Sequence, residues 1–142
     1  LQSGMMRYAV IGVKATLLDG EIDETSNEIA FSGAASDAVH QALEDNIQIL
    51  EPIMRLEVVV PEEFFGPVSS DLSQRRAEID ETEMRGKLRV IHALAPLEQL
   101  FDYTEQVRSL SQGRATPTVE PHSYRPVPEH IQSAMMNPDD NW

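Results

Sequence analysis

Hydrophobic and polar residues alternate along residues 7–18, which gives that segment one apolar face. The residues on this face are Ala9, Ile11, Val13, Ala15 and Leu17. A period of two residues predicts a half-buried strand. Asp19 and Gly20 form a turn signal that ends the strand, and an acidic loop continues to Glu24.

A helix is predicted next. Thr25 and Glu28 have the spacing of a capping box, in which two side chains satisfy backbone N–H groups at a helix start. The helix carries an apolar stripe made mostly of alanine: Phe31, Ala34, Ala35, Ala38 and Ala42. One strand and one helix cannot cover each other's apolar surfaces. We therefore interpret the chain as cut from a longer protein.

The next part of the chain predicts a strand over Ile53–Val60, a helix and an exposed polar strand over Ala77–Arg85. The helix residues Phe64, Val68 and Leu72 recur every four positions. Pro67 lies within that pattern, so we expect an irregular first turn or a later start.

A turn at residues 85–87 leads to a strand over Leu88–Ala95, with His92 on its apolar face as a hydrogen-bonded core histidine. Pro96 opens a second helix, which Gly113 closes. Its inward positions are predicted to be Leu97, Leu100, Phe101, Thr104 and Val107. A last strand, Thr116–Tyr124, contains two prolines, and a short helix over residues 128–136 uses Ile131 and Met135 as contacts.

This order, strand-helix-strand-strand-helix-strand, predicts an α+β fold of the ferredoxin-like βαββαβ type. The second and fourth strands are the edges of such a sheet. Edge strands tolerate proline and exposed polar residues because one side of the backbone has no partner. The polar strand and the proline-containing strand are the second and the fourth. Their composition therefore agrees with the edge positions that the predicted strand order gives them.

Composition narrows the possible functions. The chain has 142 residues, no cysteine and a net charge of −13. A disulfide framework and a cysteine-ligated metal are therefore excluded. No apolar run is long enough to span a membrane, and the first residues do not resemble a secretory signal. The acidity argues against bulk binding to nucleic acid, although local basic clusters remain possible.

Several long motifs carry a family resemblance. They are DGEIDETSNEIAF (19–31), ILEPIMRLEVVVPEEFFGPV (49–68), SDLSQRR (70–76) and PLEQLFDYTEQVRSLSQGRA (96–115). Over residues 7–125 the chain resembles the carboxy-terminal end of bacterial-type translation elongation factor G. The resemblance implies that residues 1–48 are the last part of domain IV (ribosomal protein S5 domain 2-like), residues 49–126 the ferredoxin-like domain V, and residues 127–142 a short helix and flexible tail.

The resemblance implies a cytoplasmic, monomeric, ribosome-binding fragment of a translational GTPase that promotes tRNA–mRNA translocation. Domain IV would meet tRNA and mRNA, and domain V ribosomal RNA and proteins. The sequence contains no Gly-x-x-x-x-Gly-Lys-Ser/Thr phosphate loop. We therefore expect no catalysis and no cofactor in this fragment, with GTP and Mg²⁺ belonging to the parent's GTPase domain.

The acidic loop departs from the family pattern, which has a histidine in the tip loop of domain IV. Here Gly20 is followed by Glu21-Ile22-Asp23-Glu24, without histidine. Acidic side chains meet RNA phosphate unfavourably unless a cation or a protein intervenes. A diverged paralogue acting in ribosome recycling is thus one alternative, and a stand-alone ferredoxin-like binding module is another.

The candidate contacts with RNA or the ribosome are four arginines and the tip loop. They are Arg75, Arg76, Arg108 and Arg114, together with Gly20, Glu21, Asp23 and Glu24. Arginine holds phosphate through two parallel hydrogen bonds. The plainer interpretation is that these arginines pair with acidic neighbours. The tip loop lacks the layout of a calcium loop, and the four scattered histidines form no catalytic pattern, so we expect no metal and no catalytic residue.

Overall fold

The computed structural model describes residues 8–44 and 46–136 and divides the chain into two compact units, residues 1–47 and 48–142. The first unit contains helix α1, Glu28–Leu43. The strand predicted over residues 7–18 is wrong for its described part, because residues 8–18 form no strand. A strand requires a hydrogen-bonding neighbour, and the described part of this unit offers none.

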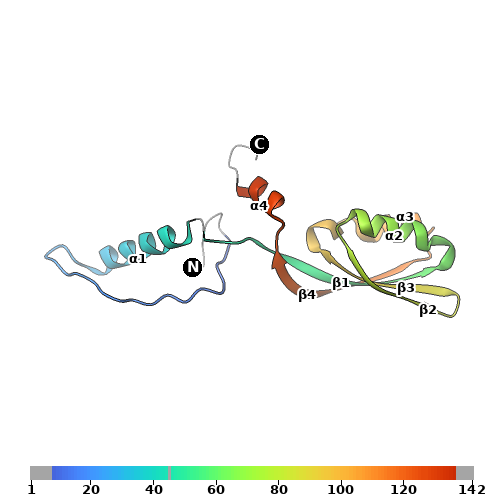
Figure 1. Cartoon of the computed structure of the whole chain (residues 1–142), viewed down its shortest axis with the longest axis horizontal. Helices are drawn as coiled ribbons and strands as arrows, with labels where there is room; N and C mark the ends of the chain where they lie inside the picture. Colours follow the sequence, from blue (N-terminus) through green and yellow to red (C-terminus); the bar gives the residue numbers. More distant parts are fainter. Residues whose placement is uncertain (1–7, 45, 137–142) are drawn as a thin grey trace. The chain divides into compact units, whose positions relative to one another are not determined.

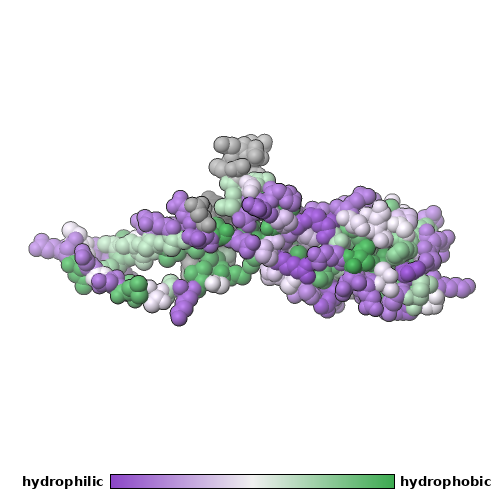
Figure 2. Space-filling view, in the orientation of Figure 1, coloured by the Kyte–Doolittle hydropathy of each residue, from purple (hydrophilic) through white to green (hydrophobic). Residues whose placement is uncertain are grey.

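Most apolar side chains among residues 8–44 are consequently open to solvent. Leu17 is 92% exposed, and no residue from 8 to 44 is buried. Figure 2 shows this hydrophobic surface in green along α1 and the segment that precedes it.

The start of α1 also differs from the prediction. Asn27, not Thr25, is the N-cap residue, and its side-chain oxygen accepts a 2.9 Å hydrogen bond from the backbone N–H of Ala30. The Thr25 hydroxyl donates instead to the carboxylate of Asp23, at 2.6 Å. The capping box is therefore wrong: the local loop satisfies Thr25, and asparagine is an equally good cap.

The second unit is built on a four-stranded antiparallel sheet in the order β2-β3-β1-β4 (Figure 1). Its strands are β1 (Leu50–Pro61), β2 (Glu78–Arg85), β3 (Leu88–Pro96) and β4 (Thr116–Pro126). The edges are β2 and β4, so the predicted ferredoxin-like order is confirmed.

Helices α2 (Phe65–Gln74) and α3 (Tyr103–Leu110) cover one face of this sheet (Figure 1). Each follows a 3-10 turn, η2 (Glu62–Phe64) or η3 (Leu97–Leu100), so the expected irregular start of the first helix is confirmed. The core lies between sheet and helices, around Leu56, Leu72 and Ile91. Helix α4 (Glu129–Met136) follows β4, and residues 137–142, predicted as a mobile tail, lie outside the described residues.

Two predicted inward positions are wrong. Phe101 is 82% exposed and Thr104 is also exposed, whereas Tyr103 is buried beside Val107. The reason is the interruption between η3 and α3, which changes the helical phase that an uninterrupted helix from Pro96 would have kept.

His92 is not a core residue. The core face of β3 consists of Ile91, Ala93 and Ala95, and successive side chains of a strand point to opposite faces. His92 therefore lies on the face away from the helices, with ring nitrogens 4.0 Å from a carboxylate oxygen of Glu57 and 3.8 Å from one of Glu83.

Among the described residues, no helix is long and apolar enough to cross a membrane.

Candidate nucleic-acid interface

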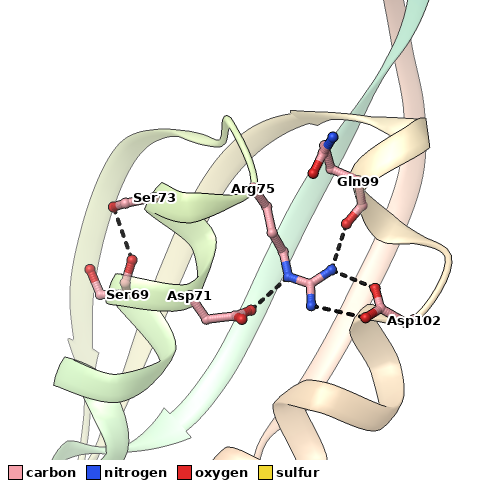
Figure 3. A network of polar contacts seen from close by, with 6 residues as sticks. All are labelled: Ser69, Asp71, Ser73, Arg75, Gln99 and Asp102. Atoms are coloured by element: carbon pink, nitrogen blue, oxygen red, sulfur yellow. Dashed lines mark hydrogen bonds and ion pairs between the residues drawn. The ribbon is translucent and has the colours of Figure 1, made fainter.

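Arg75, one of the predicted RNA contacts, is held inside the domain at the end of α2 (Figure 3). Its guanidinium donates to Asp71 at 2.8 Å and to Asp102 and the carbonyl oxygen of Gln99, both at 2.6 Å. The side chain is only 12% exposed. The hydrogen bond from Arg75 is the main cause of the lowered pKa of Asp102. This arginine is therefore occupied in joining helices.

Arg76 is paired as well. Both of its terminal nitrogens donate to the carboxylate of Glu51, whose side chain is largely buried at the start of β1. The pair borders a cavity of about 160 Å³, which Arg125 and Glu78 also line as a second ion pair. Each guanidinium here already has a carboxylate partner, so neither is available to phosphate without breaking a pair.

Arg108 and Arg114 lie elsewhere, near the junction of α3 and β4. Arg108 is exposed in the last turn of α3 and takes part in no ion pair among the residues described. Arg114 pairs with Glu63, and its guanidinium carbon lies 5.3 Å from the centre of the Phe64 ring. Gly113, with φ of +77°, donates to the carbonyl oxygen of Arg108 at 2.7 Å, so a tight turn brings Arg114 back beside the helix end.

Strand pairing brings further basic residues to the same end of the sheet. The end of β1 at Pro61 pairs with Leu88 at the start of β3, and Val59 pairs with Thr116 at the start of β4. The segments that meet here are residues 61–67, 83–89 and 108–116, which we call the basic end. They carry five of the chain's 11 basic residues but three of its 24 acidic ones. The five are Arg85, Lys87, Arg89, Arg108 and Arg114.

Sequence reasoning missed Arg85, Lys87 and Arg89 as members of this cluster. Arg89 pairs with Glu62 at 2.7 Å and lies 4.6 Å from the centre of the Phe65 ring. Within the described chain Lys87 has no ion pair, and it is exposed in the β2–β3 turn. The available signal was the Glu-Glu-Phe-Phe run after Pro61. The sequence did not indicate which arginines would contact this run, because Arg89 and Arg114 are both distant from it along the chain.

The tip loop is exposed, and its carboxylates lie in a local turn rather than in a binding cluster. Asp23 accepts hydrogen bonds from the backbone N–H and hydroxyl of Thr25, at 2.7 and 2.6 Å. The hydroxyl contact is the largest cause of the lowered pKa of Asp23. Gly20 donates its backbone N–H to Asp19 at 2.8 Å. In the described ranges, no three acidic or histidine side chains gather to hold a metal ion.

The second unit is thus an α+β domain of ferredoxin-like topology with a basic end. The family profile described as "Elongation factor G C-terminus" matches residues 48–135. The chain is 48% identical over 139 residues to elongation factor G of Fervidobacterium nodosum, covering 96% of this chain and 20% of that protein. It is 41% identical over 135 residues to elongation factor G of Neorickettsia sennetsu, covering 94% and 20%.

A solved structure from Thermus thermophilus superposes with a TM-score of 0.79 at 35% identity, covering 94% of this chain and 21% of that one. The chain belongs to the elongation factor G family of translation factors. It spans about a fifth of the length of the relatives it matches. The match to the first relative covers 96% of the chain and so includes part of the first unit, which does not favour a stand-alone ferredoxin-like module.

Proposed function

We propose that this chain is the ribosome-binding carboxy-terminal part of a translational GTPase that promotes tRNA–mRNA translocation. Residues 1–48 would form the last part of domain IV, facing tRNA and mRNA, and residues 49–126 would form domain V, facing ribosomal RNA. GTP and Mg²⁺ would bind in other parts of the parent factor. In this division of labour the chain positions the factor on the ribosome and carries out no chemical step.

The observation that carries the proposal is the concentration of positive charge at the basic end of an otherwise acidic chain. RNA attracts basic side chains through its phosphates, and binding releases the counterions that surround the backbone. An acidic remainder repels RNA elsewhere and so favours one orientation of approach. The basic end is therefore the surface of the second unit best suited to ribosomal RNA.

Within this surface, Arg108 has the simplest role. Its exposed guanidinium has no carboxylate partner within the described part of the chain, so it can bind a phosphate without first losing an ion pair. Arg75 and Arg76 do not have this freedom, because each is held by carboxylates of its own domain. We therefore assign Arg108 to binding and Arg75 and Arg76 to the fold.

Ribosome pelleting of the full-length factor tests the interface. Arg108→Glu is expected to weaken binding roughly tenfold, because a phosphate contact becomes a repulsion. Arg55→Glu is the matched control, since Arg55 is an exposed arginine on β1 with no ion pair among the described residues. Equal effects of the two substitutions would remove the basic end as the interface.

Two further measurements test the remaining parts of the proposal. The isolated chain is expected to show no GTP turnover, and measurable hydrolysis would overturn the assignment of GTP binding to other parts of the factor. The full-length factor is expected to advance mRNA on the ribosome. Splitting of ribosomes without translocation would favour the recycling alternative, for which the acidic tip loop is the relevant feature.

A further inference from the structure

The basic end contains two similar groups of three side chains. Each group consists of an arginine, a glutamate and a phenylalanine, and the two glutamates and the two phenylalanines are adjacent in sequence. In the first, Arg89 donates to both carboxylate oxygens of Glu62, at 2.9 and 2.7 Å, and its guanidinium lies over the ring of Phe65. The hydrogen bond from Arg89 is the main cause of the lowered pKa of Glu62. The Arg89 side chain is 25% exposed, whereas Glu62 is 54% exposed.

The second group is similar and uses the neighbouring glutamate and phenylalanine, but its ion pair is made through one guanidinium nitrogen, and its arginine side chain is 54% exposed. Arg114 donates to Glu63 and lies over the ring of Phe64. The Glu63 side chain is 59% exposed. Thus adjacent glutamates and adjacent phenylalanines serve two arginines that come from β3 and from the loop before β4.

The two partners of each arginine differ in how firmly they are held. Phe64 and Phe65 are partly buried and pack against the core, so their rings are fixed platforms. A guanidinium over such a ring gains a cation–π attraction and loses some of its rotational freedom. The glutamates are exposed, and exposed ion pairs contribute little to stability because water and salt screen them. The ring is therefore the lasting contact and the carboxylate the replaceable one.

We propose that Arg89 and Arg114 are preset phosphate-binding forks, in which RNA phosphates replace the carboxylates of Glu62 and Glu63 on binding. This rests on the proposed ribosome-binding function and specifies its ligand as the RNA backbone. A phosphate matches the planar fork of arginine as well as a carboxylate does. Because the ring already orients the guanidinium, less entropy is lost on binding than for an unsupported side chain.

The exchange makes opposite predictions for the two halves of each pair. In the full-length factor, Glu62→Gln and Glu63→Gln are each expected to tighten ribosome binding by about threefold, because the competing carboxylate is gone. Arg89→Gln and Arg114→Gln are each expected to weaken binding and to lower the slope of log affinity against log salt by about one. Glu98→Gln and Arg55→Gln, at exposed positions outside the basic end, are the matched controls.

The platform has its own test. Phe65→Leu keeps an apolar side chain against the core but removes the ring under Arg89. It is therefore expected to weaken ribosome binding clearly and to lower the unfolding midpoint only slightly. The exchange would be overturned if Phe65→Leu left ribosome binding unchanged. It would also be overturned if the two glutamate substitutions weakened binding as much as Arg89→Gln and Arg114→Gln do.

Failure of this inference is distinguishable from failure of the proposed function. Arg108→Glu could weaken ribosome binding while the four glutamine variants at Glu62, Glu63, Arg89 and Arg114 behave as the controls do. That result would support the interface and contradict the exchange. Protein-free large-subunit ribosomal RNA serves as the second probe. The same ranking of variants on this probe supports phosphate as the ligand. A ranking seen on ribosomes and lost on bare RNA would assign the arginines to acidic ribosomal protein and overturn the phosphate forks.

Discussion

Arg75 and Asp102 are joined across 27 residues by hydrogen bonds of 2.6 and 3.4 Å. Because the same guanidinium also holds Asp71 and the Gln99 carbonyl, one side chain joins the end of α2 to the start of α3 (Figure 3). The two helices cover the same face of the sheet, so this junction maintains their spacing above the core. A residue proposed from sequence as an RNA contact is thus better understood as a structural one.

Replacing Arg75 should destabilise the second unit. Arg75→Leu leaves Asp71, 15% exposed, without its partner and frees the Gln99 carbonyl. We expect a loss of about 2 kcal/mol in the free energy of unfolding, below the range for fully buried pairs because Asp102 is exposed. Urea unfolding followed by circular dichroism measures this loss. Arg55→Leu is the control, and an equal loss there would contradict the role of the Arg75 junction.

The same junction should make the stability of the second unit depend on pH. The pKa of Asp102 is lowered below its ordinary value of 3.8 in the folded chain. A carboxyl with a lowered folded pKa contributes stability above its unfolded pKa, and that contribution is lost as pH falls through the folded pKa. Asp102→Asn should therefore be less stable than the parent chain at neutral pH, and the difference should shrink below about pH 4. Unfolding midpoints measured across pH test this, with Asp80→Asn as the control; a difference independent of pH would contradict it.

Ser111 should stabilise the loop that carries Arg114. Its buried hydroxyl donates to the Val107 carbonyl at 2.7 Å and accepts from the Ala115 N–H at 2.9 Å. Ser111→Ala leaves that N–H without a partner in a buried place, which costs about 1–3 kcal/mol. Thermal unfolding should show the loss, whereas Ser109→Ala, at an exposed position of α3, should change stability little. Faster hydrogen exchange at Ala115 would locate the effect, and unchanged exchange would contradict it.

Asn27 should control the start of α1. Asn27→Ala removes the oxygen that accepts from the Ala30 N–H and should cost the helix about 1 kcal/mol. Hydrogen exchange at Ala30 should accelerate by several-fold. Thr25→Ala should leave the Ala30 exchange rate near that of the parent chain, because the Thr25 hydroxyl contacts Asp23. The reverse order of the two effects would restore the capping box.

Much of the second unit follows from local patterns in the sequence. The run of β-branched residues in β1 determines a buried strand, and the polar and proline-containing segments are acceptable only at the sheet edges. Repeating apolar positions around Val68 and Leu72 likewise determine which face of α2 is buried. These signals act over a few residues, so they are readable without knowing what the chain packs against.

Three features could not be read from the local pattern of apolar residues. The alternation in residues 8–18 could not produce a strand without a neighbour, and the phase of α3 was decided by the break after η3, which buried Tyr103 and exposed Phe101. The pairing of each arginine was decided by the fold, which places Glu51 against Arg76 and Phe64 against Arg114. Sequence by itself determined the order of strands and helices in the second unit and the apolar faces of β1 and α2, whereas it misplaced the inward faces of β3 and α3. Only the tertiary structure decided which charges are neutralised and which reach solvent, because ion pairing depends on distances that folding sets between remote residues.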